Sequence, residues 1–171
     1  MKIFSLLGVV VGVGVSALLL CARAQSGQSS TKAILGTWKL VSTEEKLRDG
    51  STRPYPDLGP QASGYLMYTD DGHMCAILMK PGRPKWEHSQ EHATDAEKIS
   101  AASGFTSYCG TYKLDEKNHV IWHDPEVSFC PNFLGTEQKR PYRLEGNRLI
   151  LSDVVSEGEV ERWTIVWEKV R

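Results

Sequence analysis

The stretch Ile34-Leu35-Gly36-Thr37-Trp38-Lys39-Leu40-Val41-Ser42-Thr43 decides the fold that we expect for this chain. Its even positions are apolar or small and its odd positions are largely polar; the two rows are Ile34, Gly36, Trp38 and Leu40, and Thr37, Lys39 and Thr43. An alternation with a period of two predicts a half-buried antiparallel strand. We interpret it as the first strand of a β-barrel, against which the later strands close.

Residues 1–24 predict a secretory signal peptide. Lys2 is followed by an apolar run from Ile3 to Leu20, and the small-residue pattern Ala22-Arg23-Ala24 predicts cleavage after Ala24. The run is long enough for an uncleaved membrane anchor, but its three glycines count against a stable spanning helix. We therefore expect a secreted or periplasmic protein without a stable membrane anchor after cleavage.

The remaining chain predicts one domain. Residues 25–32 are polar and rich in serine, so we expect a disordered lead-in, followed by a single domain over residues 33–171. Basic and acidic residues nearly cancel, 20 against 21, and no basic stripe is present. Because phosphate contacts need such a stripe, a nucleic-acid partner is not expected.

Three cysteines follow the leader: Cys75, Cys109 and Cys130. An odd number allows at most one disulfide within a monomer, and Cys75 with Cys109 is the most favourable of the three pairings. His88 and His92 could form a metal pair, but no third ligand accompanies them and the chain has no C-x-x-C motif. The sequence thus predicts neither a metal site nor a cofactor.

Two strands flank Asp71-Gly72, over residues 64–69 and 73–79, and we expect a type I′ turn between them. Both faces of this hairpin are apolar, which predicts a covering segment on its outer side. A long insert follows. In it, Thr94 and Glu97 predict a capping box and a short helix to about Ser103, which is a candidate lid.

The second hairpin spans residues 105–114 and 119–129. Pairing Leu114 with His119 predicts that Tyr108, Tyr112 and His123 point inward. We expect the missing side chain of Gly110 to leave room for the imidazole.

The third hairpin, residues 138–145 and 148–153, turns at Gly146-Asn147 with type II′ geometry. Its register puts Gln138, Arg140 and Tyr142 on the inner face and Arg140 opposite Asp153. The last strand, residues 160–170, alternates Trp163, Ile165 and Trp167 inward. The total is eight or nine strands, which predicts an all-β antiparallel barrel with one short helix in a long insert.

Taken together, these segments resemble the lipocalin-like domain family, a calycin-type group with secreted bacterial and polyketide-related members. The resemblance covers residues 35–167 and rests on Leu35-Gly36-Thr37-Trp38, on Gly64-Tyr65-Leu66-Met67-Tyr68-Thr69 with Asp71-Gly72-His73-Met74, on Met79 to Pro84, on Tyr108-Cys109-Gly110-Thr111-Tyr112, on His123, Glu126 and Ser128, and on Pro131-Asn132, Gly135-Thr136-Glu137-Gln138 and Arg140. One departure is Asp124, which follows His123 where such domains often have a second histidine. The resemblance implies an antiparallel barrel with an internal cavity, but no agreed ligand or reaction.

Lipocalins also commonly stack an arginine on the tryptophan of the first strand. By this resemblance, Gly36 and Trp38 should lie beside Trp167 at the closed end, with Arg171 packed over the Trp38 indole.

Three functions stay open. The first is binding of a small, mostly apolar or amphipathic molecule inside the barrel, by Tyr108, Tyr112, His123, Gln138, Arg140 and Tyr142. The second is an enzyme, a cyclase or isomerase of polyketide-like substrates, with His123 as acid or base, Tyr108 or Tyr112 as acid and Arg140 stabilising an enolate. The third is an interaction module whose aromatic side chains fill a solid barrel.

Overall fold

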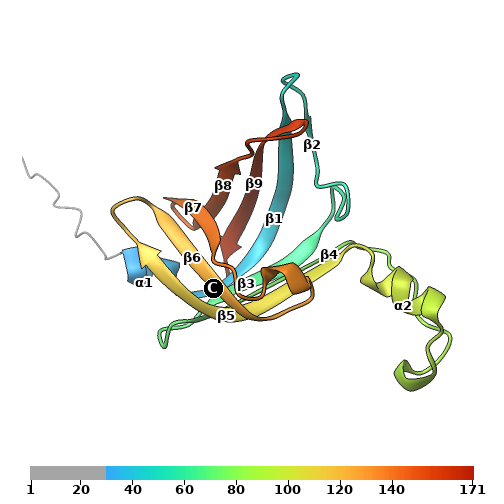
Figure 1. Cartoon of the computed structure of the whole chain (residues 1–171). Helices are drawn as coiled ribbons and strands as arrows, with labels where there is room; N and C mark the ends of the chain where they lie inside the picture. Colours follow the sequence, from blue (N-terminus) through green and yellow to red (C-terminus); the bar gives the residue numbers. More distant parts are fainter. Residues whose placement is uncertain (1–29) are drawn as a thin grey trace, which may run out of the picture.

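The computed structural model describes residues 30–171, which form an antiparallel sheet closed into a barrel (Figure 1). The strands are β1 (Gly36–Leu47), β2 (Thr52–Arg53), β3 (Ser63–Tyr68), β4 (His73–Met79), β5 (Phe105–Asp115), β6 (Val120–Ser128), β7 (Gln138–Glu145), β8 (Arg148–Val154) and β9 (Val160–Lys169). Their order follows the sequence from β3 to β9, and the pairing of β1 with β9 closes the ring. β2 is an extra strand that pairs only with the end of β1. The predicted antiparallel barrel of eight to nine strands is confirmed.

The described helices are short: α1 (Ser30–Ile34), α2 (Asp95–Ala102) and the 3-10 turns η1 (Gln90–His92) and η2 (Pro131–Phe133). The predicted capping box of α2 is present, with Thr94 and Glu97 each bonding the backbone of the other. No helix among residues 30–171 has the length and apolar character to cross a membrane. The expected signal peptide and residues 25–29 of the expected lead-in lie outside the described residues, whereas residues 30–32 begin α1.

The first and last strands close the barrel as predicted, but a different cation covers the tryptophan. Trp38 pairs with Lys169, and Leu40 with Trp167. The Lys169 ammonium lies 4.9 Å from the centre of the Trp38 ring, and its Nζ donates a 2.7 Å hydrogen bond to the Ala33 carbonyl. Arg171 is exposed, and its predicted stacking is wrong because β9 ends at Lys169, directly opposite Trp38.

A bulge at Val41 changes which residues of β1 face inward. The β1–β9 register shifts between Leu40 and Ser42, so the inward positions are even before the bulge and odd after it. Thr43, which the alternation placed on the wet face, is therefore only 6% exposed. Ile34 is not part of the strand either. It ends α1, where its carbonyl accepts a 2.7 Å hydrogen bond from Trp38 Nε1.

The β3–β4 hairpin differs from expectation in its turn and on its outer face. A type I′ turn needs positive φ at both central residues, and here only Gly72 has a positive φ, of 88°. Its N–H donates a hydrogen bond to the Thr69 carbonyl. The two observations fit a type I turn followed by a glycine. No segment among the described residues covers the outer face, because Tyr65, Ile77 and Met79 are 38–49% exposed. The predicted Cys75–Cys109 disulfide joins β4 to β5 on that side, and Cys130 is free.

The register of the β5–β6 hairpin is two residues away from the predicted one. Leu114 pairs with Ile121 and Tyr112 with His123, across a turn in which His119 has a positive φ of 53°. A shift of two keeps every side chain on its face, so Tyr108 and His123 point inward as predicted. Gly110 has another role than the expected one: a Cβ there would lie 2.0 Å from the Asp124 carbonyl oxygen, so glycine admits the bulged β6 backbone rather than the imidazole.

The β7–β8 hairpin has the predicted pairs Leu144–Leu149 and Tyr142–Leu151. Its two-residue turn has positive φ at Gly146 alone, as type II′ geometry requires. Arg140 does not pair with Asp153, because the ladder stops at Tyr142 and the Asp153 carboxylate instead forms an ion pair with Lys139, 3.4 Å away.

The barrel interior is solid at the end covered by α1. The side chains there are at most 2% exposed, and the largest are Trp38, Tyr68, Met74, Ile121 and Leu149. At the opposite end, residues of the loops that follow β2, α2 and β6 surround a cavity. The sequence left open whether the barrel is hollow or solid. In the structure the half next to α1, called the lower half below, is packed, and the opposite, upper half is hollow.

Candidate functional site

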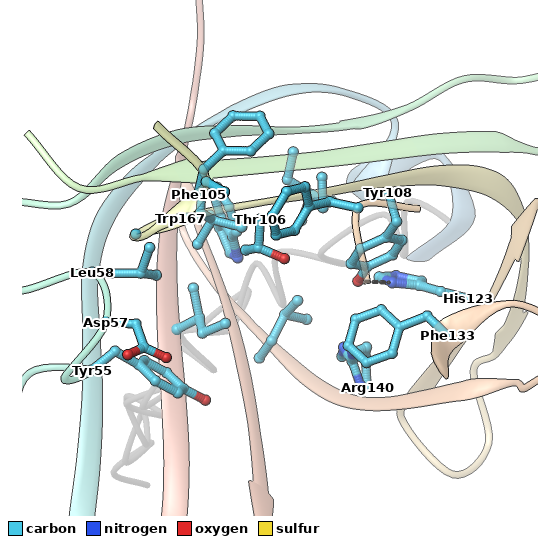
Figure 2. A pocket seen from close by; sticks show the side chains of 18 of the residues that line it. Tyr55, Asp57, Leu58, Phe105, Thr106, Tyr108, His123, Phe133, Arg140 and Trp167 are labelled. Carbon is cyan, nitrogen blue, oxygen red and sulfur yellow. Dashed lines mark hydrogen bonds between the residues drawn. The ribbon is translucent and has the colours of Figure 1, made fainter. Parts of the chain in front are cut away.

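A cavity of about 620 Å³ occupies the hollow half of the barrel (Figure 2). Its walls are mostly apolar and come from nearly every strand; the wall residues are Leu66, Ala76, Leu78, Thr106, Tyr108, His123, Arg140, Leu151, Ile165 and Trp167. Its rim comes from loops and from the adjoining ends of α2, β5 and η2; these residues are Tyr55, Asp57, Leu58, Ala102, Ser103, Gly104, Phe105, Phe129 and Phe133. Ligand pockets in proteins have volumes of roughly 300–1,000 Å³ and mainly apolar walls, so the cavity has the size and character of a small-molecule site.

The polar centre of the cavity wall is a chain of three side chains. His123 on β6 is fully buried, and each of its ring nitrogens meets a tyrosine hydroxyl. Nε2 lies 2.8 Å from the Tyr68 oxygen and Nδ1 lies 2.9 Å from the Tyr108 oxygen. Tyr68 stands on β3 and Tyr108 on β5, so the imidazole links strands on different parts of the barrel wall.

Burial keeps this cluster uncharged. It lowers the pKa of His123 well below its ordinary value, and the positive charge of Arg140 lowers it further. Burial likewise raises the pKa of Tyr68 well above its ordinary value. It also raises the pKa of Tyr108, and the positive charge of Arg140 opposes this rise. At neutral pH the three groups are therefore a neutral imidazole and two phenols.

Arg140 is the one cationic residue that lines the cavity. Its guanidinium lies 5.6 Å from the centre of the Trp163 ring, and NH1 donates a 2.9 Å hydrogen bond to the Lys139 carbonyl. Within the described part of the chain no carboxylate forms an ion pair with it. At the rim, burial raises the pKa of Tyr55 to about 12, an effect that Glu45 increases and the positive charge of Arg140 opposes.

Three of the six predicted ligand-binding residues line this cavity: Tyr108, His123 and Arg140. Tyr112 lies below it, where its ring packs on Tyr68 and its hydroxyl donates to the Thr69 carbonyl over 3.0 Å. The Gln138 amide instead donates to Thr136 Oγ1. Tyr142 is buried but does not line this cavity, and its hydroxyl has no hydrogen-bond partner among residues 30–171.

Several residues that line or support the site are not predicted by the sequence pattern. Tyr68, the second partner of His123, lies in a strand that is apolar on both faces, so alternation could not assign its direction. The rim residues Tyr55, Leu58 and Phe133 belong to loops or to the short turn η2, which have no periodicity to interpret. Trp167, which the sequence predicts to lie at the barrel closure, also lines the cavity.

The insert contributes less to the site than a lid would. Figure 1 shows α2 and the loop before it projecting beyond the ends of β4 and β5, and only residues 102–104 reach the cavity rim. His88 contacts Glu97 and His92 contacts Ser89 instead of sharing a helical face. In the described part of the chain, no three histidine, cysteine or acidic side chains are placed to hold a metal ion.

Comparisons with known proteins found a matching family and a similar carrier protein. Residues 35–170 match the model of the lipocalin-like domain. The chain is also 32% identical, over 108 residues, to a 4'-hydroxy-3'-methoxypropiophenone carrier protein of Aspergillus oryzae. The match covers 57% of this chain and 96% of that protein. No solved structure matched the chain.

Proposed function

This chain belongs to the lipocalin-like domain family, and we propose that it binds one small, mostly apolar molecule in the upper half of the barrel. The observation that carries the proposal is the cavity of about 620 Å³, whose apolar walls surround a single hydrogen-bonded polar cluster. Apolar walls supply affinity, and a few fixed polar groups orient the ligand. The name of the Aspergillus oryzae relative supports a carrier of aromatic ketones as the starting point for ligand tests.

The same geometry argues against His123 as a catalytic acid or base. A general base needs a nitrogen lone pair within hydrogen-bond reach of the substrate, and here both ring nitrogens are engaged by tyrosine hydroxyls. The low pKa of the buried imidazole leaves little of the protonated form that a general acid requires. The cavity itself argues against the solid-barrel alternative.

The proposal is tested by titrating the protein with 4'-hydroxy-3'-methoxypropiophenone and with N-phenyl-1-naphthylamine, a neutral fluorescent probe, and measuring stoichiometry by native mass spectrometry. Ala76 and Ile77 are neighbours on β4, one lining the cavity and the other 38% exposed on the outer face. We expect 1:1 binding that Ala76→Phe abolishes and Ile77→Phe preserves. Failure of every probe to bind, or equal loss in both variants, would contradict binding inside the barrel.

Secretion is a separate part of the proposal and rests on the sequence of residues 1–24. Amino-terminal sequencing of the protein exported from its own host should start at Gln25. A chain that keeps its leader would contradict it.

A further inference from the structure

The chain Tyr68–His123–Tyr108 has a direction, because a neutral imidazole has one N–H donor and one acceptor nitrogen. Tyr68 is 1% exposed, and among the described residues its hydroxyl meets only His123 Nε2. If Nε2 carried the hydrogen, the Tyr68 hydroxyl hydrogen would be buried without an acceptor, which costs about 1–3 kcal/mol. The favoured arrangement is therefore a Tyr68 hydroxyl that donates to Nε2 and an Nδ1–H that donates to the Tyr108 oxygen.

This direction leaves the hydroxyl hydrogen of Tyr108 free. The Tyr108 oxygen accepts from His123 Nδ1 over 2.9 Å, and the positive charge of Arg140 acts on the same phenol. Its own hydrogen has no protein acceptor within the described residues, and Tyr108 lines the cavity. The cluster thus presents a hydrogen-bond donor to a ligand.

Arg140, which also lines the cavity, likewise offers hydrogen-bond donors to a ligand. Trp163 and the Lys139 carbonyl hold the guanidinium in place, yet no protein carboxylate in residues 30–171 neutralises it. An arginine has five N–H donors, so donors remain for a ligand. The acidic residue that lines the cavity, Asp57, is exposed, and Figure 2 shows it beside Tyr55, on the other side of the cavity from Arg140 and Phe133.

We propose that the ligand carries one anionic oxygen group, a carboxylate or a phenolate, which binds the Tyr108 hydroxyl and the Arg140 guanidinium while its apolar body packs against Trp167, Leu78 and Ile165. This inference rests on the proposed binding function and specifies its ligand class. Two converging donors, one of them charged, match the acceptor oxygens of such a group, and charge-assisted hydrogen bonds are the strong ones in an apolar surrounding. A neutral hydrocarbon would instead leave both donors without a partner.

The test uses two probes with the same aromatic body: neutral N-phenyl-1-naphthylamine and anionic 8-anilino-1-naphthalenesulfonate. Arg140→Gln removes the cation that faces the cavity. Lys139→Gln is the matched control, because Lys139 is the neighbouring residue on the outer face and its loss changes the net charge equally. We expect Arg140→Gln to raise the Kd of the anionic probe at least tenfold and that of the neutral probe less than threefold. We expect Lys139→Gln to change neither.

Tyr108→Phe is a second variant, in case Arg140→Gln does not fold. It should raise the Kd of the anionic probe severalfold more than the Kd of the neutral probe. Displacement of the sulfonate by 4-propylbenzoate or by 4-propylphenol then distinguishes a carboxylate from a phenolate. The inference is overturned if Arg140→Gln weakens both probes equally or if Lys139→Gln has the same effect. If neither probe binds to the wild type, the proposed function itself fails. If the probes bind and the anionic preference survives in Arg140→Gln and in Tyr108→Phe, only the ligand class is wrong.

Discussion

Lowering the pH below about 6.5 should destabilise this protein through His123. The imidazole of an unfolded chain takes up a proton near pH 6.5. In the folded barrel burial and the charge of Arg140 hold the pKa of His123 well below that value. Between the two pKa values the unfolded state binds more protons than the folded state, so the free energy of unfolding falls as the pH falls.

The magnitude follows from the linkage relation. A single histidine that titrates only in the unfolded state lowers the free energy of unfolding by up to about 1.4 kcal/mol for each pH unit below about 6.5. Acidic groups act at lower pH. The hydrogen bonds of Asp71 with Thr69 and His73, and those of Glu97 with Thr94, Glu87 and His88, lower the pKa of both carboxyls to about 2, so their contributions are lost below about pH 4.

Urea unfolding followed by tryptophan fluorescence, at half-unit steps from pH 7.5 to pH 5.0, measures this slope. His123→Gln is the control because its amide does not titrate, and the slope attributable to residue 123 is the difference between the two proteins. A wild-type stability that stays level below pH 6.5, or a slope shared by His123→Gln, would refute the neutral, buried imidazole. The same result would remove the basis for the direction assigned to the tyrosine hydroxyls.

Three further predictions concern the barrel itself. Gly110→Ala should destabilise the fold by about 1–3 kcal/mol or more, since its Cβ would lie 2.0 Å from a backbone oxygen that cannot easily move; wild-type stability in urea unfolding would contradict the close approach at the bulge. Lys169→Gln should cost about 1–3 kcal/mol through its lost contacts with Trp38 and the Ala33 carbonyl, whereas Arg171→Gln should stay within about 0.5 kcal/mol; the reverse order would contradict the observed closure. Thiol titration of denatured protein that starts at Gln25 should find one free cysteine before reduction and three after it, and three before reduction would exclude the Cys75–Cys109 disulfide.

The alternation of side chains predicted which residues face inward better than it predicted their partners. Tyr108 and His123 were assigned to the correct face although the β5–β6 register was two residues off, since a shift by two preserves the face. The turn at His119 and the bulge opposite Gly110 set that register, and neither has a clear sequence signature. The bulge at Val41 is a similar case, and there the shift by one residue reversed the face of Thr43.

Alternation also says nothing about height along the barrel axis. Tyr112 and Tyr142 were grouped with Tyr108 because they share its inward parity, yet the cavity occupies only one half of the barrel. The height of a residue depends on strand stagger and on the loops that close each end. For the same reason, alternation along β9 cannot tell whether Lys169 or Arg171 covers Trp38, because both have the same parity. The register decides it, since Lys169 lies directly opposite Trp38.

A crystal structure of the protein with its tightest-binding probe would show directly whether the ligand lies inside the barrel. We expect one ligand molecule in the hollow half of the barrel, with an anionic oxygen within hydrogen-bond distance of the Tyr108 hydroxyl and the Arg140 guanidinium and its apolar body against Trp167. Ligand density on the exposed outer face around Tyr65 and Ile77, with the cavity closed by its own side chains, would contradict it.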